Sequence, residues 1–472
     1  MVVIINEELC TAGSDHAVFS WVTPGKKADT TVYLGERPTA LDKNTGYPDT
    51  EYHLAEVRGL KPSTRYWYTV ASGGVRGSLN SFVTLPAPAG KLLFSLGLIG
   101  DVHIALGDPV NDVNEKYFGK LSKYSSVLFA QCVRDIIARN IDLALMTGDL
   151  TDSSSERQYQ ELRSSLLPGF GGIPYIACIG NHDKYLKHAG LGERGFLKYA
   201  ANREKTRASV SIRGHQLILM DSCSPDKDWG QVGEEQISWA AQRLKETAGH
   251  PSFIFLHHPC SGVDVWFGVK DFRKLQRMIR RFPDVRGVFC GHMHRHNVSV
   301  SRFLTGSLPY VVLPATVQYP CSYAVMRVYE EGYEYNAYKI NRLDLSEMSR
   351  DSILFKHGGR AVFSRYSFGG IGDRSISYSR RRLHRHKQYE LSVTLEHKEA
   401  MTLFARAQAA GGASCAPAAE KGKTRVILGR HDSLSLALSS RLQKIPLCGI
   451  KASVLKEGNF NLPEKIIKTY YG

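Results

Sequence analysis

The feature that most constrains the fold of this chain is an alternation of short apolar runs with segments of helical periodicity. The apolar runs have the length of strands and lie at residues 92–100, 141–147, 173–179, 253–256 and 285–290. Amphipathic helical segments separate or precede them, such as residues 125–140 and 234–247. Because alternating strands and helices form parallel sheets that the helices cover, the pattern predicts a layered α/β domain. The β-rich segments that could complete a second sheet are residues 310–313 and 323–338.

Polar residues directly follow each of the five apolar runs. They form the segments Asp101-Val102-His103, Gly148-Asp149-Leu150-Thr151-Asp152, Gly180-Asn181-His182-Asp183, His257-His258-Pro259 and Gly291-His292-Met293-His294. The carboxyl ends of strands form the functional edge of an open α/β sheet, so we expect these side chains to converge. Asp, Asn and His are suitable ligands for Mn, Fe or Zn. The sequence therefore predicts a metal site at this edge.

Spacing within these segments supports convergence on common centres. In Asp101-x-His103 and in His292-x-His294 the two side chains are two residues apart, and in extended backbone they share one face. A glycine stands one residue before a candidate ligand at Gly148, Gly180 and Gly291. Glycine suits a sharp turn where the backbone leaves a strand.

The charges of the candidate ligands favour two metal ions over one. Asp101 and Asp149 are the two carboxylates among them, while Asn181 and the imidazoles are neutral. Two divalent ions would leave an excess of about +2, which a bridging hydroxide and an anionic phosphate ester would offset. A single ion would leave most of the candidate ligands without a role.

The ordered set D-x-H, G-D, G-N-H-D, H and G-H-x-H resembles the calcineurin-like metallophosphoesterase superfamily over residues 92–340. The resemblance implies a four-layer β-sandwich flanked by helices and a hydrolase that uses two divalent metal ions on phosphoester bonds. One metal would be held by Asp101, His103 and His294, the second by Asn181, His257 and His292, and Asp149 would bridge both. His182 would contact the phosphoryl oxygen or protonate the leaving group, with Asp183 as its orienting carboxylate.

Details of the site resemble class III cyclic-nucleotide phosphodiesterases and bacterial glycerophosphodiesterases. This resemblance is based on the first D-x-H motif, Asp101-Val102-His103, and on His257-His258-Pro259. A purple acid phosphatase is expected to have Tyr at position 152, whereas this chain has Asp152, which we expect to cap the following helix. We therefore expect a phosphodiesterase acting on a small diester, either a cyclic nucleotide or a glycerophosphodiester. The alternatives are a purple acid phosphatase-like phosphomonoesterase, a nuclease and a non-catalytic scaffold, and His258 either lines the pocket or contacts substrate.

The first part of the chain, residues 1–87, predicts a small all-β sandwich of strands rich in β-branched and aromatic residues. Residues 60–66, Leu-Lys-Pro-Ser-Thr-Arg-Tyr, resemble the tyrosine corner of fibronectin type III domains, and the sandwich resembles the domain that precedes purple acid phosphatase catalytic domains. A Pro-rich linker at residues 85–90 favours a boundary there. We predict three domains: residues 1–87, a metallophosphoesterase domain at 88–343, and a basic extension of unknown fold at 344–472.

Charge, cysteines and hydropathy add expectations about partners and location. Residues 341–472 contain 23 Lys and Arg against 11 Asp and Glu, so they carry most of the net charge of +16. The basic run at residues 380–387 could bind nucleic acid or acidic headgroups, or could be a solvated segment, and a small phosphoester remains the favoured partner. Nine cysteines without a CxxC pair suit a reducing compartment. With neither a signal-peptide pattern nor an apolar run long enough to cross a bilayer, we expect a cytoplasmic protein.

Overall fold

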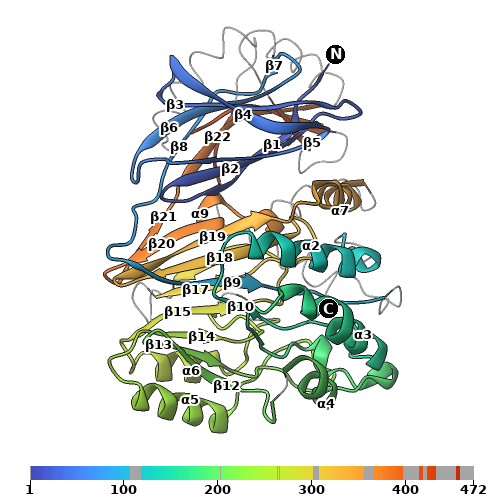
Figure 1. Cartoon of the computed structure of the whole chain (residues 1–472), viewed down its shortest axis with the longest axis vertical. Helices are drawn as coiled ribbons and strands as arrows, with labels where there is room; N and C mark the ends of the chain where they lie inside the picture. Colours follow the sequence, from blue (N-terminus) through green and yellow to red (C-terminus); the bar gives the residue numbers. More distant parts are fainter. Residues whose placement is uncertain are drawn as a thin grey trace.

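Two β-sandwiches are stacked along the long axis of the molecule, with helices mainly around the lower one (Figure 1). The computed structural model describes residues 2–106, 119–201, 203–262, 264, 266–300, 308–355, 366–396, 414–417, 423–431 and 453–457. Among the described helices, none combines the length and the apolar character that crossing a membrane requires.

The upper sandwich is built mainly from the N-terminal part of the chain. One sheet contains β1 (Ile5–Ala12), β2 (His16–Val22) and β5 (Tyr52–Arg58), and the other contains β3 (Ala28–Arg37), β4 (Ala40–Thr50), β6 (Arg65–Ser72), β7 (Val75–Arg76) and β8 (Asn80–Val83). Phe19, Trp21 and Tyr68 are fully buried between the two sheets. The Tyr66 hydroxyl accepts a hydrogen bond from the Lys61 N–H at 3.0 Å, which confirms the tyrosine corner.

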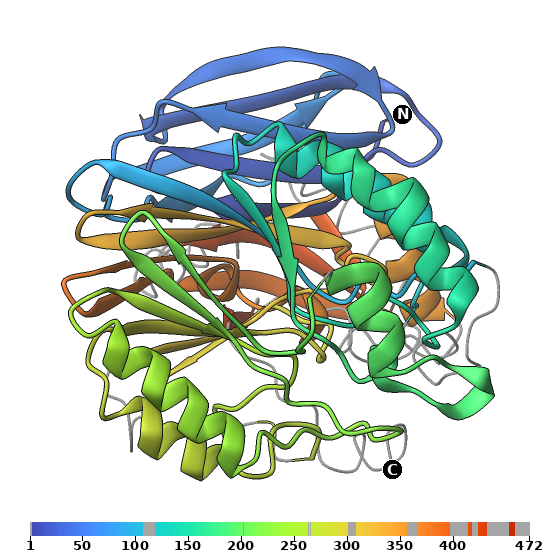
Figure 2. The same cartoon turned by 60° about the horizontal axis from the view of Figure 1, so that its bottom comes forward.

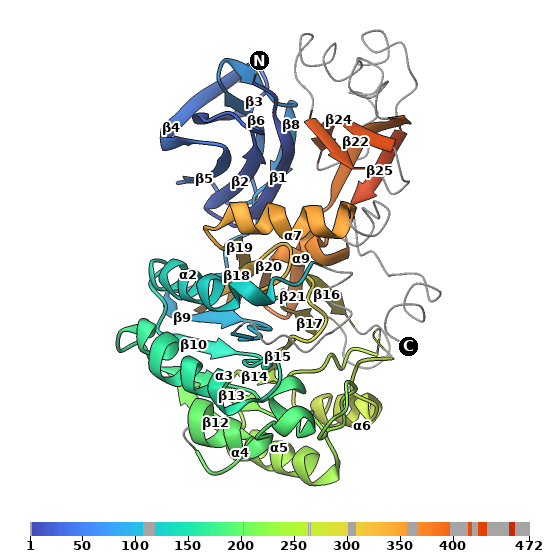
Figure 3. The same ribbon diagram turned by 90° about the vertical axis from the view of Figure 1, so that its right-hand side faces the viewer.

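The first of these sheets is extended by strands from the end of the chain. These strands are β22 (Gln388–Glu396), β23 (Ser414–Pro417), β24 (Lys423–His431) and β25 (Ser453–Glu457), and the strand order is β25-β22-β24-β23-β1-β2-β5. The parallel pairing of Ile5 with Cys415 joins the two parts of the chain. Figure 3 shows β22, β24 and β25 beside the N-terminal strands. Described parts of residues 344–472 thus belong to a sheet that begins in the N-terminal part. The predicted domain boundaries remain a prediction.

The lower sandwich consists of two sheets that face each other. The first has the order β11-β10-β9-β18-β19-β20-β21, with β9 (Leu92–Ile99), β10 (Leu143–Met146), β11 (Tyr175–Ala177), β18 (Ser322–Tyr329), β19 (Gly332–Lys339), β20 (Ser375–Ser379) and β21 (Arg382–Arg385). The second has the order β12-β13-β14-β15-β17-β16, with β12 (Ala208–Ile212), β13 (His215–Leu219), β14 (Ser252–Phe255), β15 (Val285–Cys290), β16 (Asn297–Val300) and β17 (Pro309–Val312). Leu96, Leu145, Phe255 and Phe289 form part of the apolar core between them.

Helices cover the outer face of the second sheet and part of the outer face of the first, as Figure 2 shows. The first sheet packs against α2 (Ser125–Ile137) and against α3 (Glu156–Glu161) with the short helices that follow it, whereas α5 (Glu234–Glu246) and α6 (Phe272–Ile279) cover the second. The remaining described helices are η1 (Ser122–Tyr124), η2 (Leu162–Leu166), η3 (Leu167–Phe170), η4 (His182–Lys184), η5 (Lys187–Ala189), α4 (Glu193–Gly195), η6 (Phe196–Ala201), α7 (Leu343–Phe355) and α9 (Ile371–Arg374). The predicted α/β class, with an all-β N-terminal region, is confirmed.

Buried polar contacts join the two sandwiches. The Lys339 Nζ lies 2.5 Å from the Glu8 carboxylate, and the His16 Nε2 lies 2.7 Å from the Tyr338 hydroxyl oxygen. Arg374 donates hydrogen bonds to the backbone carbonyls of Leu9 and Cys10. Because separating these groups would leave buried charges unpaired, the N-terminal sandwich is held firmly against the domain that carries the polar strand ends.

Candidate metal centre

The polar segments predicted to converge do lie together, because the strands they follow run in parallel. β9, β10 and β11 are parallel neighbours, and so are β14 and β15. Their ends place seven polar side chains around one centre: Asp101, His103, Asp149, Asn181, His257, His292 and His294. Six of them are buried, and His292 is partly exposed. The exposed edge at His292 opens the centre toward solvent.

Two groups of donor atoms share one carboxylate oxygen. The Oδ2 of Asp149 lies 3.4 Å from the His103 Nε2 and 3.2 Å from the His257 Nε2. On one side, the His103 Nε2 is 3.0 Å from the Nε2 of His294, which is 3.9 Å from Asp101 Oδ1. On the other side, the Asn181 Oδ1 is 2.9 Å from the His257 Nε2 and 3.1 Å from His292 Nδ1.

These separations fit donors that share metal ions. Two ligand atoms bound to one ion at about 2.1 Å are separated by roughly 3.0–3.4 Å. Most of the measured distances fall in or near this interval. The Asp101 Oδ2 is buried and lacks a hydrogen-bond partner among the described residues, so its lone pairs are open to a cation. The residue types and the geometry therefore fit two cations on either side of Asp149.

The backbone at the strand ends adopts an unusual conformation. Five of the seven side chains stand on residues with positive φ, namely Asp101 (47°), His103 (47°), Asp149 (50°), His292 (70°) and His294 (47°). This left-handed region is unfavourable for residues with a Cβ and is concentrated at functional sites. Side-chain acceptors hold the turns: Asp101 accepts the His292 N–H at 2.8 Å, and Asp149 accepts the His182 N–H at 2.9 Å.

Neighbouring acceptors orient two of the imidazoles. The Nδ1 of His257 lies 2.8 Å from the carbonyl oxygen of Thr147, and the Nδ1 of His294 lies 2.8 Å from the Oε1 of Gln318. When Nδ1 carries the proton for these acceptors, Nε2 keeps its lone pair for a metal. Thr147 and Gln318 have no distinguishing sequence signal, and only the structure places them here.

Burial and mutual repulsion set the ionisation of the site. Burial lowers the pKa of His103 to about 4 and of His294 to about 3, so both imidazoles are neutral near pH 7. Burial also raises the pKa of Asp101 to about 8, and the nearby Asp149 carboxylate adds to this shift. For His257 burial opposes protonation, but the Asp149 carboxylate prevails and raises the pKa to about 9. Without metal, protons therefore neutralise a site whose carboxylates repel each other.

The structure corrects the predicted role of Asp183. Its carboxylate accepts hydrogen bonds from the backbone N–H groups of Leu150 at 3.1 Å, Thr151 at 2.9 Å and Gly180 at 3.0 Å. The prediction that Asp183 orients His182 is wrong, because these donors occupy both carboxylate oxygens and tie the loops after β10 and β11 together. His182 is instead oriented by its Nδ1, which lies 2.6 Å from the Asp152 carbonyl oxygen.

Asp152 also differs from its prediction. Ser155 is the N-cap of α3, where its side chain accepts the Gln158 N–H, so the predicted capping role of Asp152 is wrong. The Asp152 Oδ1 lies 2.5 Å from the Lys120 Nζ and 3.2 Å from the His103 Nδ1. Both partners of the Lys120–Asp152 ion pair have fully buried side chains. Lys120 was not predicted, since an isolated lysine far from the polar strand ends gives no sequence signal.

His258 lies beside the centre and is fully buried. Its Nδ1 is 2.9 Å from the Ser222 hydroxyl oxygen, and its ring centroid is 4.4 Å from that of His292. Its donor atom forms a compact group with those of His257 and His292. His258 thus lines the site behind His292, and direct contact with substrate stays a prediction.

Comparison with known families agrees with this geometry. Residues 94–296 match the calcineurin-like phosphoesterase family, and residues 8–84 match the purple acid phosphatase N-terminal domain. A probable cyclic nucleotide phosphodiesterase of Synechococcus is 32% identical over 162 residues, which cover 33% of this chain and 59% of that protein. A probable glycerophosphodiester phosphodiesterase of Arcobacter nitrofigilis is 27% identical, covering 39% of this chain and 70% of that protein. The chain thus spans about three fifths of the cyanobacterial relative.

Solved structures give weaker likenesses. A dimetal phosphatase from Danio rerio has a TM-score of 0.45 at 13% identity, covering 52% of this chain and 96% of that one. The purple acid phosphatase of yellow lupin seeds has a TM-score of 0.38 at 17% identity, covering 72% and 73%. At these TM-scores neither likeness supports an argument about the site.

Proposed function

We propose, from the calcineurin-like phosphoesterase domain that residues 94–296 form, that the protein is a metal-dependent phosphodiesterase acting on a small diester. The observation that supports this most is the shared oxygen of Asp149, which lies 3.4 Å from His103 and 3.2 Å from His257. One carboxylate oxygen shared by two groups of oxygen and imidazole donors is suited to a pair of divalent ions, which two-metal hydrolases hold roughly 3.5–4 Å apart.

The donor set suggests how the ions would be held. Asp101, His103 and His294 would bind one ion, Asn181, His257 and His292 the other, and Asp149 both. Oxygen and imidazole donors suit Mn, Fe or Zn. When bound, such ions polarise the phosphoryl group and neutralise the charge that develops on it.

His182 is the protein group best placed to act on the substrate. Its Nδ1 is held at the Asp152 carbonyl, and its ring centroid is 4.6 Å from that of His103. With Nδ1 engaged, Nε2 is left to hydrogen-bond a phosphoryl oxygen or to donate a proton to the leaving oxygen. Asp183 acts at a distance, by fixing the loop that carries His182.

Two observations favour a diester over a monoester. Position 152, where a purple acid phosphatase is expected to have a metal-binding Tyr, carries an Asp that Lys120 already neutralises. The relatives are also named as phosphodiesterases of cyclic nucleotides and of glycerophosphodiesters.

Hydrolysis of two chromogenic esters tests the proposal. Purified protein loaded with Mn²⁺ is expected to hydrolyse bis-p-nitrophenyl phosphate faster than p-nitrophenyl phosphate. Asn181→Ala should lose bound metal and activity together, whereas the control Asn44→Ala, at a partly exposed position on β4 of the N-terminal sandwich, should retain both. The reverse substrate preference would indicate a phosphomonoesterase, and no hydrolysis by metal-loaded protein would refute the proposal.

The same protein preparation also tests the alternative that the substrate is a nucleic acid. Cleavage of DNA or RNA that weakens as salt rises would indicate a nuclease guided by basic residues. The small-diester proposal expects activity on the chromogenic diester that is nearly independent of salt.

A further inference from the structure

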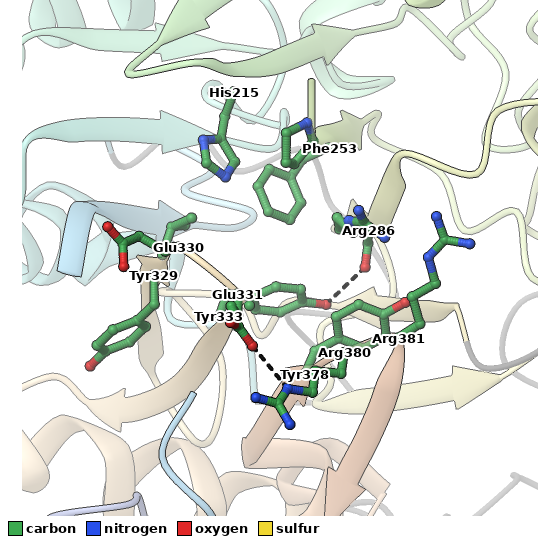
Figure 4. A pocket seen from close by; sticks show the side chains of 13 residues that line it. His215, Phe253, Arg286, Tyr329, Glu330, Glu331, Tyr333, Tyr378, Arg380 and Arg381 are labelled. Carbon is green, nitrogen blue, oxygen red and sulfur yellow. Dashed lines mark hydrogen bonds and ion pairs between the residues drawn. The ribbon is translucent and has the colours of Figure 1, made fainter. Parts of the chain in front are cut away.

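A hollow of about 240 Å³, whose lining is shown in Figure 4, lies away from the metal centre in the lower sandwich. It is lined by His215, Phe253 and Arg286, which stand at or near the starts of β13, β14 and β15, and by the turn between β18 and β19. The candidate ligands His257 and His292 follow the ends of β14 and β15. These two strands therefore run from the hollow to the metal centre.

The floor of the hollow is aromatic and closed. Phe253 and Tyr333 are each 1% exposed, and their ring centroids are 5.4 Å apart in an edge-to-face contact. Tyr378 stacks on Tyr333 with centroids 5.4 Å apart. Because these rings pack on one another and are almost inaccessible, they form a rigid base that closes the hollow on this side.

The rim carries a strained turn that presents two arginines. β20 and β21 are joined by Arg380 and Arg381 alone, and both have positive φ, 48° and 60°. Consecutive residues of this kind form a type I′ turn, which strongly favours Asn-Gly because a Cβ is unfavourable in the left-handed region. A hairpin selected only for stability would not place two arginines here, and strained residues are concentrated at sites of function.

The acidic residues of the rim are already engaged within the protein. Glu331 accepts a hydrogen bond from the Arg380 Nε at 2.9 Å, and Glu330 accepts the backbone N–H of Lys91 at 2.9 Å. The Arg286 guanidinium lies 3.8 Å from Asp284 and donates a long hydrogen bond of 3.5 Å to the Pro283 carbonyl oxygen. In Figure 4 the side chains of Arg286 and Arg381 lie on one side of the hollow and the Arg380–Glu331 pair on the other.

We propose that this hollow binds the phosphoryl group of a small phosphorylated molecule, as a site separate from the metal centre. The guanidinium groups of Arg286 and Arg381 would hold the phosphoryl group, because their planar forks match its oxygens. The hollow, of about 240 Å³, leaves room for a phosphoryl group with a small substituent.

Titration calorimetry with phenylphosphonate tests this site, because the probe is a small dianion that resembles a phosphoryl group and resists hydrolysis. We expect metal-loaded protein to show two saturable binding events and chelator-treated protein to retain one. Arg286→Gln and the double variant Arg380→Asn, Arg381→Gly should each weaken the retained event at least tenfold. The control Arg243→Gln, which removes a surface arginine of α5 paired with Glu246, should not.

The double variant gives a second and opposite readout. Asn-Gly relieves the strain of the turn, so the melting temperature of that variant should rise while its binding is lost. A purely structural turn would show the rise without any effect on binding. The proposal is overturned if chelation abolishes all binding, or if either variant binds phenylphosphonate as the wild type does. These outcomes do not depend on whether the metal centre hydrolyses diesters.

Discussion

The buried pair of Lys120 and Asp152 allows a quantitative test of how the metal centre is supported. The Lys120 Nζ lies 2.5 Å from the Asp152 Oδ1, and both side chains are 0% exposed. Lys120→Met keeps much of the side-chain volume but removes the ammonium group. Asp152 then remains buried beside His103 without its cation.

The expected loss of unfolding free energy is about 3–5 kcal/mol, the range measured when one partner of a buried ion pair is removed. Although burial alone would raise the pKa of Asp152, the Lys120 charge holds that pKa well below its usual range, so the carboxylate is fully charged in the wild type. In Lys120→Met its protonation would limit the loss to the lower end of that range. A double variant, Lys120→Met with Asp152→Asn, should recover much of the stability, because neither charge is then left unpaired.

A matched surface pair supplies the control. Lys61 lies 2.7 Å from Glu36, yet their side chains are 70% and 49% exposed. Lys61→Met should therefore cost far less unfolding free energy than Lys120→Met, because an exposed ion pair contributes little. Urea denaturation of chelator-treated proteins measures both losses without a contribution from bound metal. Equal losses for the two lysine variants, or a loss below about 1 kcal/mol for Lys120→Met, would refute the reasoning.

Three further predictions concern the site itself. His182→Asn should lower kcat by a factor of about 10²–10⁴ and leave the metal content unchanged. The decrease should be smaller for a p-nitrophenyl diester than for an alkyl diester, because a good leaving group does not need a proton donor. Steady-state kinetics measures the rates, and mass spectrometry measures the bound metal. Gly180→Ala should abolish metal binding, because its Cβ would overlap the backbone nitrogen and Oδ1 of Asp149, whereas Gly169→Ala, whose nearest contact would be 3.5 Å, should leave metal content unchanged. Chelated protein should lose stability as the pH rises from about 6.5 to 9. In the folded state the pKa of His257 is raised to about 9 and that of Asp101 to about 8, so the folded state binds these protons more tightly than the unfolded chain does. A flat unfolding profile of chelated protein across this window would contradict that assignment, and saturating Mn²⁺ should stabilise the protein and change the profile by displacing those protons.

The sequence by itself was sufficient to locate the candidate metal centre. Its donors are placed by a local rule: each follows a strand directly, and parallel neighbouring strands end at one edge of the sheet. Hydrophobic periodicity also indicated the layered α/β class and the all-β N-terminal region, because each helix or strand that buries one face must repeat its apolar residues with its own period. Residues 60–66 further predicted the tyrosine corner, since that motif is local as well.

Only the tertiary structure decided which groups support those donors. Lys120 and Asp152 are 32 positions apart, and β1 pairs with β23 across roughly the whole chain, so no local period relates these partners. Asp183 and Asp152 were assigned the wrong partners for the same reason. A carboxylate next to a histidine in sequence bonds whichever donors packing brings to it, and here those donors are the loop N–H groups and a buried lysine.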